Sequence, residues 1–319
     1  MIEWNSKTRL IISDVDETIA PVYMEAEEEM VKELELLLQE GKVIFFISGQ
    51  SVTNIKWRIV DRIDSLARKN ILIGHCSGCE VWGFDEKGNV NEKPFCSYYQ
   101  ELLTESNKIQ WREVIDIIVE KFKLNKYPTM PKPKFRLLTN KPQDIMYEDR
   151  GPQITFEVIN GINLNDENKQ KLNEEFNFGT DDFRDPIILE AHKLLSERNI
   201  PITPRKAGTF AIDFAIRGVT KTTAVHHAMT NEYLVKQFNL KDIKPEEIEI
   251  WGDKFSITNG GTDRHICEAL DHNVRAITFR KDEEDLPDNY NVVVWDGNNE
   301  LEEGTLEYIK SRKMSKMEN

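Results

Sequence analysis

Apolar residues follow two alternating patterns along the first 85 residues. Short apolar runs predict buried strands at "RLIIS" (9–13), "KVIFFIS" (42–48) and "NILIGHC" (70–76). Between these runs, apolar residues at steps of three and four predict amphipathic helices over 30–38 and 52–66. Strands that alternate with helices predict a parallel sheet with right-handed crossovers.

The alternation returns in the last third of the chain. We expect strands at "FAIDFAIR" (210–217), "EIEIWGD" (247–253), "RAITFR" (275–280) and "NVVVWDG" (291–297), and helices near Thr220 and at "TLEYIKSRK" (305–313). The middle differs: "FDEKGNV" (84–90) is typical of a turn, "KFRLLTN" (134–140) and "QITFEVI" (153–159) of strands, and polar helical stretches flank "DFRDP" (182–186). The sequence therefore predicts an α/β, Rossmann-like parallel-sheet core in residues 1–86 and 216–319, with an inserted α+β cap domain in 87–215.

Charge and length narrow the class of protein. The 319 residues include 42 Lys and Arg against 56 Asp and Glu, a net charge of −14, which disfavours nucleic acid and an anionic membrane as partners. No apolar run approaches the roughly 18 residues of a membrane span, and "MIEWNSKTRL" lacks the apolar centre of a signal peptide. We therefore expect a cytoplasmic protein.

Four cysteines are too few for a disulfide framework in a chain of this length. Cys76 and Cys79 form a CxxC, but a zinc ribbon would need a second pair. A redox pair stays open, and a turn that holds two reduced thiols is the favoured interpretation.

Carboxylates gather where the first predicted strand ends. Asp14, Asp16 and Glu17 lie within four positions, and like charges repel by roughly 4 kcal/mol per pair at 4 Å and an effective dielectric near 20. Ligands bind at the carboxyl ends of parallel strands, where Ser48, Lys221 and Asp253 are also expected. A hard divalent cation prefers oxygen ligands and would offset the repulsion.

Four segments, "DVDET", "ISGQS", the lysine of "GVTK" and "WGDKFSITNGGTD", resemble in order the motifs of the haloacid dehalogenase superfamily. The resemblance is to its large-cap branch, with sugar-phosphate phosphatases and eukaryotic-type phosphomannomutases. It implies that Asp14 is a nucleophile that forms an aspartyl-phosphate and that Asp16 is the general acid and base. It also implies Mg²⁺ held by Asp14, the backbone carbonyl of Asp16 and Asp253, and phosphate bound by Ser48, Gly49 and Lys221.

Several of these residues have structural alternatives. The aspartates could cap turns, Ser48 and Gly49 could simply begin a helix, and Lys206 competes with Lys221 as the phosphate-binding lysine. Thr18 is expected to brace the loop. Asp263 is either a supporting carboxylate behind the site or a helix cap.

Two departures from the phosphomannomutase pattern argue against carrying over the mutase activity. Glu17 stands where many relatives have glycine, and the loop between Asp253 and Asp263 is longer.

The cap contains two candidate anion-binding features. Residues 121–141 carry seven Lys or Arg and no Asp or Glu, which is typical of either an anion-attracting patch or, slightly favoured, a solvated loop. Arg150 precedes a predicted strand, as substrate-contacting arginines do in similar mutase caps, and its planar guanidinium suits phosphate. Arg136 and Arg184 are weaker candidates.

The expected function is Mg²⁺-dependent hydrolysis of a small phosphomonoester, with a phosphorylated sugar as the first candidate substrate. A phosphosugar mutase similar to phosphomannomutase is the main alternative. A non-catalytic sensor of phosphorylated ligands is the alternative from another class.

Overall fold

Two compact units make up the protein, whose computed structural model describes residues 2–177, 179–258 and 260–315. The core unit comprises the chain up to Ser97 and again from Val219 onward, and the inserted unit comprises Tyr98–Gly218. None of the helices in the described ranges combines the length and apolar character needed to cross a bilayer.

An eight-stranded sheet forms the centre of the core unit, in the order β13-β12-β11-β1-β2-β3-β4-β5. Neighbours from β13 to β3 pair in parallel, and β4 and β5 add antiparallel pairs at one edge. The strands are β1 (Leu10–Ser13), β2 (Val43–Ile47), β3 (Ile71–His75), β4 (Glu80–Trp82), β5 (Cys96–Ser97), β11 (Ile248–Gly252), β12 (Arg275–Thr278) and β13 (Val292–Val294). The α/β class with a parallel core sheet is confirmed.

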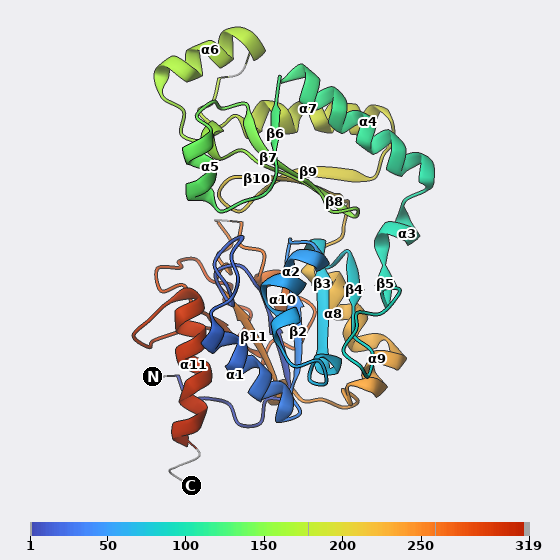
Figure 1. Ribbon diagram of the computed structural model, residues 1–319, viewed down its shortest axis with the longest axis vertical. Coiled ribbons are helices and arrows are strands. Elements are labelled where there is room, and N and C mark those ends of the chain that lie inside the picture. The colour runs from blue at the N-terminus through green and yellow to red at the C-terminus, as the bar shows by residue number, and fades with distance from the viewer. Residues whose placement is uncertain (1, 178, 259, 316–319) are drawn as a thin grey trace. The chain divides into compact units, whose positions relative to one another are not determined.

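Helices cover both faces of this sheet (Figure 1). On one face, Leu34 and Leu37 of α1 and Ile309 of α11 pack with Ile44 and Phe46 of β2 in the main hydrophobic cluster. On the other face, α8 is packed against α9 and α10. The helices are α1 (Glu28–Gln39), α2 (Val52–Arg58), α8 (Lys221–Thr230), α9 (Glu232–Gln237), α10 (Arg264–Cys267) and α11 (Leu301–Ser315).

The inserted unit contains a five-stranded sheet in the order β6-β7-β8-β10-β9. Helices α4 and α7 pack against each other, and α7 contacts β9 and β10. The elements are α3 (Tyr98–Leu102), α4 (Glu105–Lys121), β6 (Asn125–Tyr127), α5 (Lys132–Leu138), β7 (Asp144–Asp149), β8 (Gln153–Glu157), α6 (Asp166–Phe176), α7 (Arg184–Glu197), β9 (Ile202–Ala207) and β10 (Ala211–Ile216). This α+β composition matches the expectation for the insertion.

Two sequence predictions of local structure are wrong, and a third segment forms the predicted strand but within the inserted sheet. The segment "KFRLLTN", expected to be a strand, lies mostly in helix α5, and its last two residues follow that helix. A proline in the first turn suits a helix start, and only Phe135 of this helix is buried. "FAIDFAIR" contributes β10 to the inserted sheet, where it pairs antiparallel with β8 and β9. The helix expected over 52–66 ends at Arg58, and a 3₁₀ turn follows at Val60–Arg62.

Both junctions between the two units lie beyond the expected domain boundaries. The sequence placed the insertion at 87–215, whereas the compact units divide after Ser97 and after Gly218. The first difference arises because β4 and β5 pair with the core sheet, and the second because β10 extends to Ile216. The domain assignment itself stays a prediction.

Candidate active site

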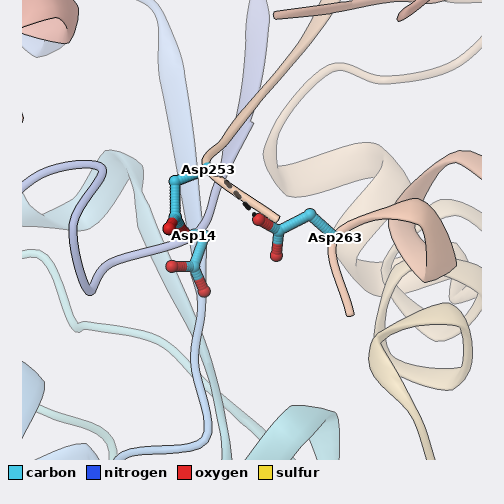
Figure 2. A group of neighbouring side chains, drawn as sticks. All are labelled: Asp14, Asp253 and Asp263. Carbon is cyan, nitrogen blue, oxygen red and sulfur yellow. Dashed lines mark hydrogen bonds between the residues drawn. The ribbon is translucent and has the colours of Figure 1, made fainter. Parts of the chain in front are cut away.

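Strand register brings the first and last predicted acidic residues together. In the parallel pair β1–β11, Ser13 lies opposite Trp251, and Asp14 extends the pairing by donating its backbone N–H to the Trp251 carbonyl oxygen at 2.9 Å. Asp14 and Asp253 therefore leave neighbouring strands at the same edge of the sheet. Figure 2 shows their side chains next to each other.

Lys221 and Asp263 complete a buried cluster with these two residues. Lys221 is the first residue of α8, and its Nζ lies 2.5 Å from Asp14 Oδ1 and 2.7 Å from Asp263 Oδ1. Asp263 Oδ2 accepts backbone N–H groups from Asp253 at 3.0 Å and from Lys254 at 2.9 Å, the first of which is drawn in Figure 2. Asp263 thus supports the loop that carries Asp253; its side chain caps no helix.

Burial dominates the electrostatics of this cluster. It raises the pKa of Asp14 more than Lys221 lowers it, and Asp263 and Asp253 raise it further. Burial likewise raises the pKa of Asp253 to about 7, although Lys254 and Arg280 oppose the shift. For Lys221, burial favours the neutral amine, but Asp14 and Asp263 outweigh it and raise the pKa. Negative charge is therefore in excess around a protonated lysine.

Asp16 faces a different set of partners. Ser48 Oγ donates a hydrogen bond to Asp16 Oδ2 at 3.2 Å, and Arg58 Nη1 lies 2.8 Å from Asp16 Oδ1. The fully buried Arg58 also donates to the carbonyl oxygens of Pro21 and Met24, each at 2.7 Å. Arg58 therefore fixes both the Asp16 side chain and the loop that follows it.

Glu17 belongs to a second charged group, which adjoins Asp253. Its Oε2 lies 2.9 Å from Lys254 Nζ and 2.8 Å from Arg280 Nη2. Arg280 Nη2 also donates to Asp253 Oδ2 at 2.7 Å, and Arg280 Nε to the Asp253 carbonyl oxygen at 3.1 Å. Glu17 has φ 61°, which lies in the left-handed region that favours glycine.

The structural alternatives for Ser48, Gly49 and Thr18 can be compared with their contacts in the core unit. Ser51, not Ser48, caps α2 by accepting the Asn54 backbone N–H, so a helix start does not explain Ser48. A Cβ at Gly49 would meet only Ser77 Oγ at 3.9 Å, so packing does not require glycine there. Thr18 is fully buried, and its Oγ1 finds no hydrogen-bond partner among the described residues; it fills space in the loop.

Lys206 and Arg150 lie in the inserted unit. Lys206 pairs there with Asp182 and Asp185. Arg150 is nearly buried, and its Nε lies 2.9 Å from Glu148 Oε2. Its role in substrate binding stays a prediction, as does that of the basic stretch 121–141, which includes α5.

The acidic cluster has the composition of a divalent-cation site. Carboxylate oxygens of Asp14, Asp253 and Asp263 lie within 4.8 Å of one another, and all three residues are buried. Mg²⁺ takes oxygen ligands and would offset the repulsion between these carboxylates. The residues therefore fit Mg²⁺, with Asp263 nearer to the ligand set than the sequence suggested.

Sequence reasoning missed Arg58, Lys254 and Arg280. Arg58 lies in the amphipathic pattern of 52–66, where an arginine is typical of a solvent-facing position. The sequence did contain a signal for Lys254 and Arg280. Both residues come shortly after the end of a core strand, β11 or β12, where charged side chains gather.

No protein-family model and no curated protein sequence matches the chain. Solved structures do match over nearly its full length. A candidate phosphatase from Eubacterium rectale matches with a TM-score of 0.51 and 15% identity, covering 96% of this chain and 100% of that one. A trehalose-6-phosphate phosphatase related protein matches with a TM-score of 0.51 and 15% identity, covering 97% and 99%. The IMP-bound IMP-nucleotidase of Plasmodium falciparum matches with a TM-score of 0.49 and 13% identity, covering 96% and 68%.

At these identities the similarity concerns the fold. The protein shares the fold of these solved structures, a Rossmann-like core with an insertion, and this fold agrees with the one that the ordered motifs in its sequence indicated.

Proposed function

We propose that the protein is a phosphatase that hydrolyses a small phosphomonoester, with a phosphorylated sugar as the first candidate substrate. The observation that carries the proposal is the contact of Lys221 with Asp14 beside Asp253, inside the fold of known phosphatases. A buried carboxylate, a buried ammonium group and further carboxylates at strand ends are the components of phosphoryl transfer.

In this proposal Asp14 attacks phosphorus and becomes an aspartyl-phosphate. Asp16 protonates the leaving oxygen and then takes a proton from the water that attacks the intermediate. Ser48 holds Asp16 through its hydroxyl and, with the Gly49 backbone and Lys221, would contact the phosphate oxygens as charge spreads over them. Glycine at position 49 then serves the close approach of a phosphate, since packing does not require it.

Mg²⁺ would be held by Asp14, Asp253 and the backbone carbonyl of Asp16, with Asp263 close to this set. When bound, the ion would reduce the repulsion between the anionic nucleophile and an anionic phosphate. Arg280 and Lys254 hold the Asp253 side chain, and Asp263 holds its backbone, so the ligand oxygens are oriented by the chain itself.

The names of the matched structures support the choice of reaction and suggest substrates to assay. One matched chain is related to a trehalose-6-phosphate phosphatase and another is an IMP-nucleotidase. The purified protein with Mg²⁺ should therefore be tested against sugar phosphates and nucleoside monophosphates, with phosphate release as the readout. We expect release from at least one sugar phosphate.

Asp14→Asn should abolish this release, while Asp116→Asn, at an exposed position in the inserted unit, should leave it unchanged. Release that persists in Asp14→Asn would overturn the assignment of the nucleophile. A requirement for a sugar bisphosphate would favour the mutase alternative. Ligand binding without turnover of any phosphomonoester would favour the sensor.

A further inference from the structure

At the end of β3, a buried carboxylate contacts an imidazole, and the imidazole contacts a thiol. His75 Nε2 lies 2.8 Å from Glu80 Oε2, and His75 Nδ1 lies 3.3 Å from Cys76 Sγ. The three residues are at most 8% exposed. They belong to the core unit, and none of them is among the residues placed in the phosphoryl-transfer chemistry.

The hydrogen bonds of Glu80 determine which atoms of this group donate protons and which accept them. Ser97 Oγ donates to Glu80 Oε1 at 2.6 Å, and Trp82 Nε1 donates to Glu80 Oε2 at 3.0 Å. Burial raises the pKa of Glu80, but hydrogen bonds from His75 and Ser97 outweigh it and lower the pKa. An ionised Glu80 accepts the His75 Nε2–H, which leaves Nδ1 as the acceptor for the Cys76 thiol proton.

We propose that Cys76 is a reactive thiol, activated by His75 and Glu80, and that hydrogen peroxide oxidises it to a disulfide with Cys79. The arrangement of nucleophile, base and orienting carboxylate is the one that activates cysteine thiolates. Hydrogen peroxide is the oxidant because both cysteines are only 2% exposed, and this reagent is close to water in size.

The chemistry proceeds in two balanced steps. The Cys76 proton passes to His75 Nδ1, the thiolate sulfur attacks one peroxide oxygen, the O–O bond breaks, and hydroxide leaves as water after taking a proton. The resulting sulfenic acid is attacked by the Cys79 thiol, which forms the S–S bond and releases a second water. The two thiols lose two electrons and two protons in total, and one peroxide is reduced to two waters.

A short turn joins Cys76 to Cys79. The residues Cys76–Gly78 form a 3₁₀ turn, and the Cys79 backbone N–H donates to the carbonyl oxygens of His75 at 3.0 Å and Cys76 at 3.2 Å. The turn thus curls back on the strand end from which Cys76 projects. Cys76 and Ser77 have φ 52° and 58°, so the turn is held in a conformation that non-glycine residues rarely adopt.

The same turn contacts both elements that would bind phosphate. The Ser77 backbone N–H donates to the Ser48 carbonyl oxygen at 2.8 Å, and that of Cys76 to the Gln50 carbonyl oxygen at 3.1 Å. A Cβ on Gly78 would lie 3.0 Å from the Thr220 carbonyl oxygen, next to Lys221. A disulfide that reshapes the turn would therefore displace the Ser48 loop and the start of α8, a consequence that rests on the proposed function.

Peptide mapping of the native full-length protein tests the thiol reaction directly. Trypsin releases residues 70–87, which contain Cys76 and Cys79 but neither Cys96 nor Cys267. After brief exposure to hydrogen peroxide we expect this peptide to lose two hydrogens at least tenfold faster than Cys267 is oxidised. Burial raises the pKa of Cys267 to about 12, so that thiol serves as the internal control. Equal rates would overturn the proposal.

Two variants separate the steps. Cys79→Ser should stop at a sulfenic acid on Cys76, detected as a dimedone adduct, and Glu80→Gln should slow oxidation of Cys76 at least tenfold. An unchanged rate in folded Glu80→Gln would refute activation by the carboxylate. If that variant unfolds, the comparison of Cys76 with Cys267 in the unaltered protein still decides the matter.

The link to phosphate binding has its own readout. Inorganic phosphate with Mg²⁺ should raise the unfolding temperature of the reduced protein and raise it less after oxidation. An equal rise in both states would overturn the link to the Ser48 loop. No rise in the reduced protein, with oxidation of residues 70–87 intact, would instead count against the proposed function and leave the reactive thiol standing.

Discussion

Lys221 Nζ lies 2.5 Å from Asp14 Oδ1, although 207 positions separate the two residues. Both side chains are buried, and Asp263 approaches the same ammonium group from the other side. The positive charge of one lysine therefore compensates part of the negative charge of two carboxylates. This happens where strands from the first and last parts of the chain pair with each other.

Lys221→Met should destabilise the protein by about 3–5 kcal/mol, because two buried carboxylates would lose their counter-charge. Urea unfolding in the presence of a chelator measures this change. The double variant Lys221→Met/Asp263→Asn should recover part of the loss, since it removes one of the two stranded charges. Lys171→Met, which breaks an exposed pair with Glu167 on α6, should have little effect. A double variant no more stable than Lys221→Met would contradict the pairing.

Mg²⁺ should stabilise the folded protein whether or not a substrate is present. An ion that binds the folded state alone adds about 2.7 kcal/mol at a concentration 100 times its Kd. Thermal unfolding over a Mg²⁺ titration checks this. Asp253→Asn should remove most of the shift, whereas Asp85→Asn, in the turn between β4 and β5, should retain it. A shift that survives Asp253→Asn would place the ion elsewhere.

The metal-free protein should lose stability as pH rises from about 4 to about 7. Burial raises the pKa of Asp253 in the folded state to about 7, against 3.8 for an ordinary aspartate. Between these values the folded state retains a proton that the unfolded chain has released, so the free energy of unfolding falls with rising pH. The raised pKa of Asp14 acts in the same direction. Urea midpoints across this range, measured with chelator, should show the fall, and Asp253→Asn should make it smaller.

Glu17→Gly should leave stability nearly unchanged, and Glu17→Ala should lower it. Both lose partly exposed ion pairs with Lys254 and Arg280, worth about 0.2–1 kcal/mol each. Only glycine also removes the strain of the left-handed backbone conformation at position 17, and this gain in stability is roughly 1 kcal/mol. Chemical denaturation should therefore rank glycine above alanine by about that amount. The reverse order would show that the φ of 61° imposes no strain.

The sequence predicted the core sheet well because its strands are continuous apolar runs, typical of parallel strands buried on both faces. It predicted the meeting of Asp14 with Asp253 because both residues follow such strands. The alternation in "AIDFAI" was the overlooked signal in β10: Asp213 in its middle indicates one polar face, which suits an antiparallel sheet. The place of β10 in the inserted sheet follows from its antiparallel pairing with β8 and β9, which its own sequence does not reveal.

The site itself was only partly predictable for the same reason. Arg58, in a short helix, shows nothing in its local pattern that marks a fully buried guanidinium group; only tertiary packing around Asp16 reveals it. The position of Lys221 was expected from a strand before it and from a helix start near Thr220, and the preceding strand belongs to the inserted sheet instead of the core sheet. The N-terminus of α8 in fact delivers the residue to the cluster.

The central position of β1, between β2 and β11, bears on how the protein is made. On the ribosome, β1 and β2 emerge early, whereas β11 is synthesised only after the entire inserted unit. Until then the nascent chain exposes a bare strand edge, with Asp14 deprived of its lysine. Premature release at this stage would yield fragments prone to aggregation, so complete synthesis is a condition for a folded core.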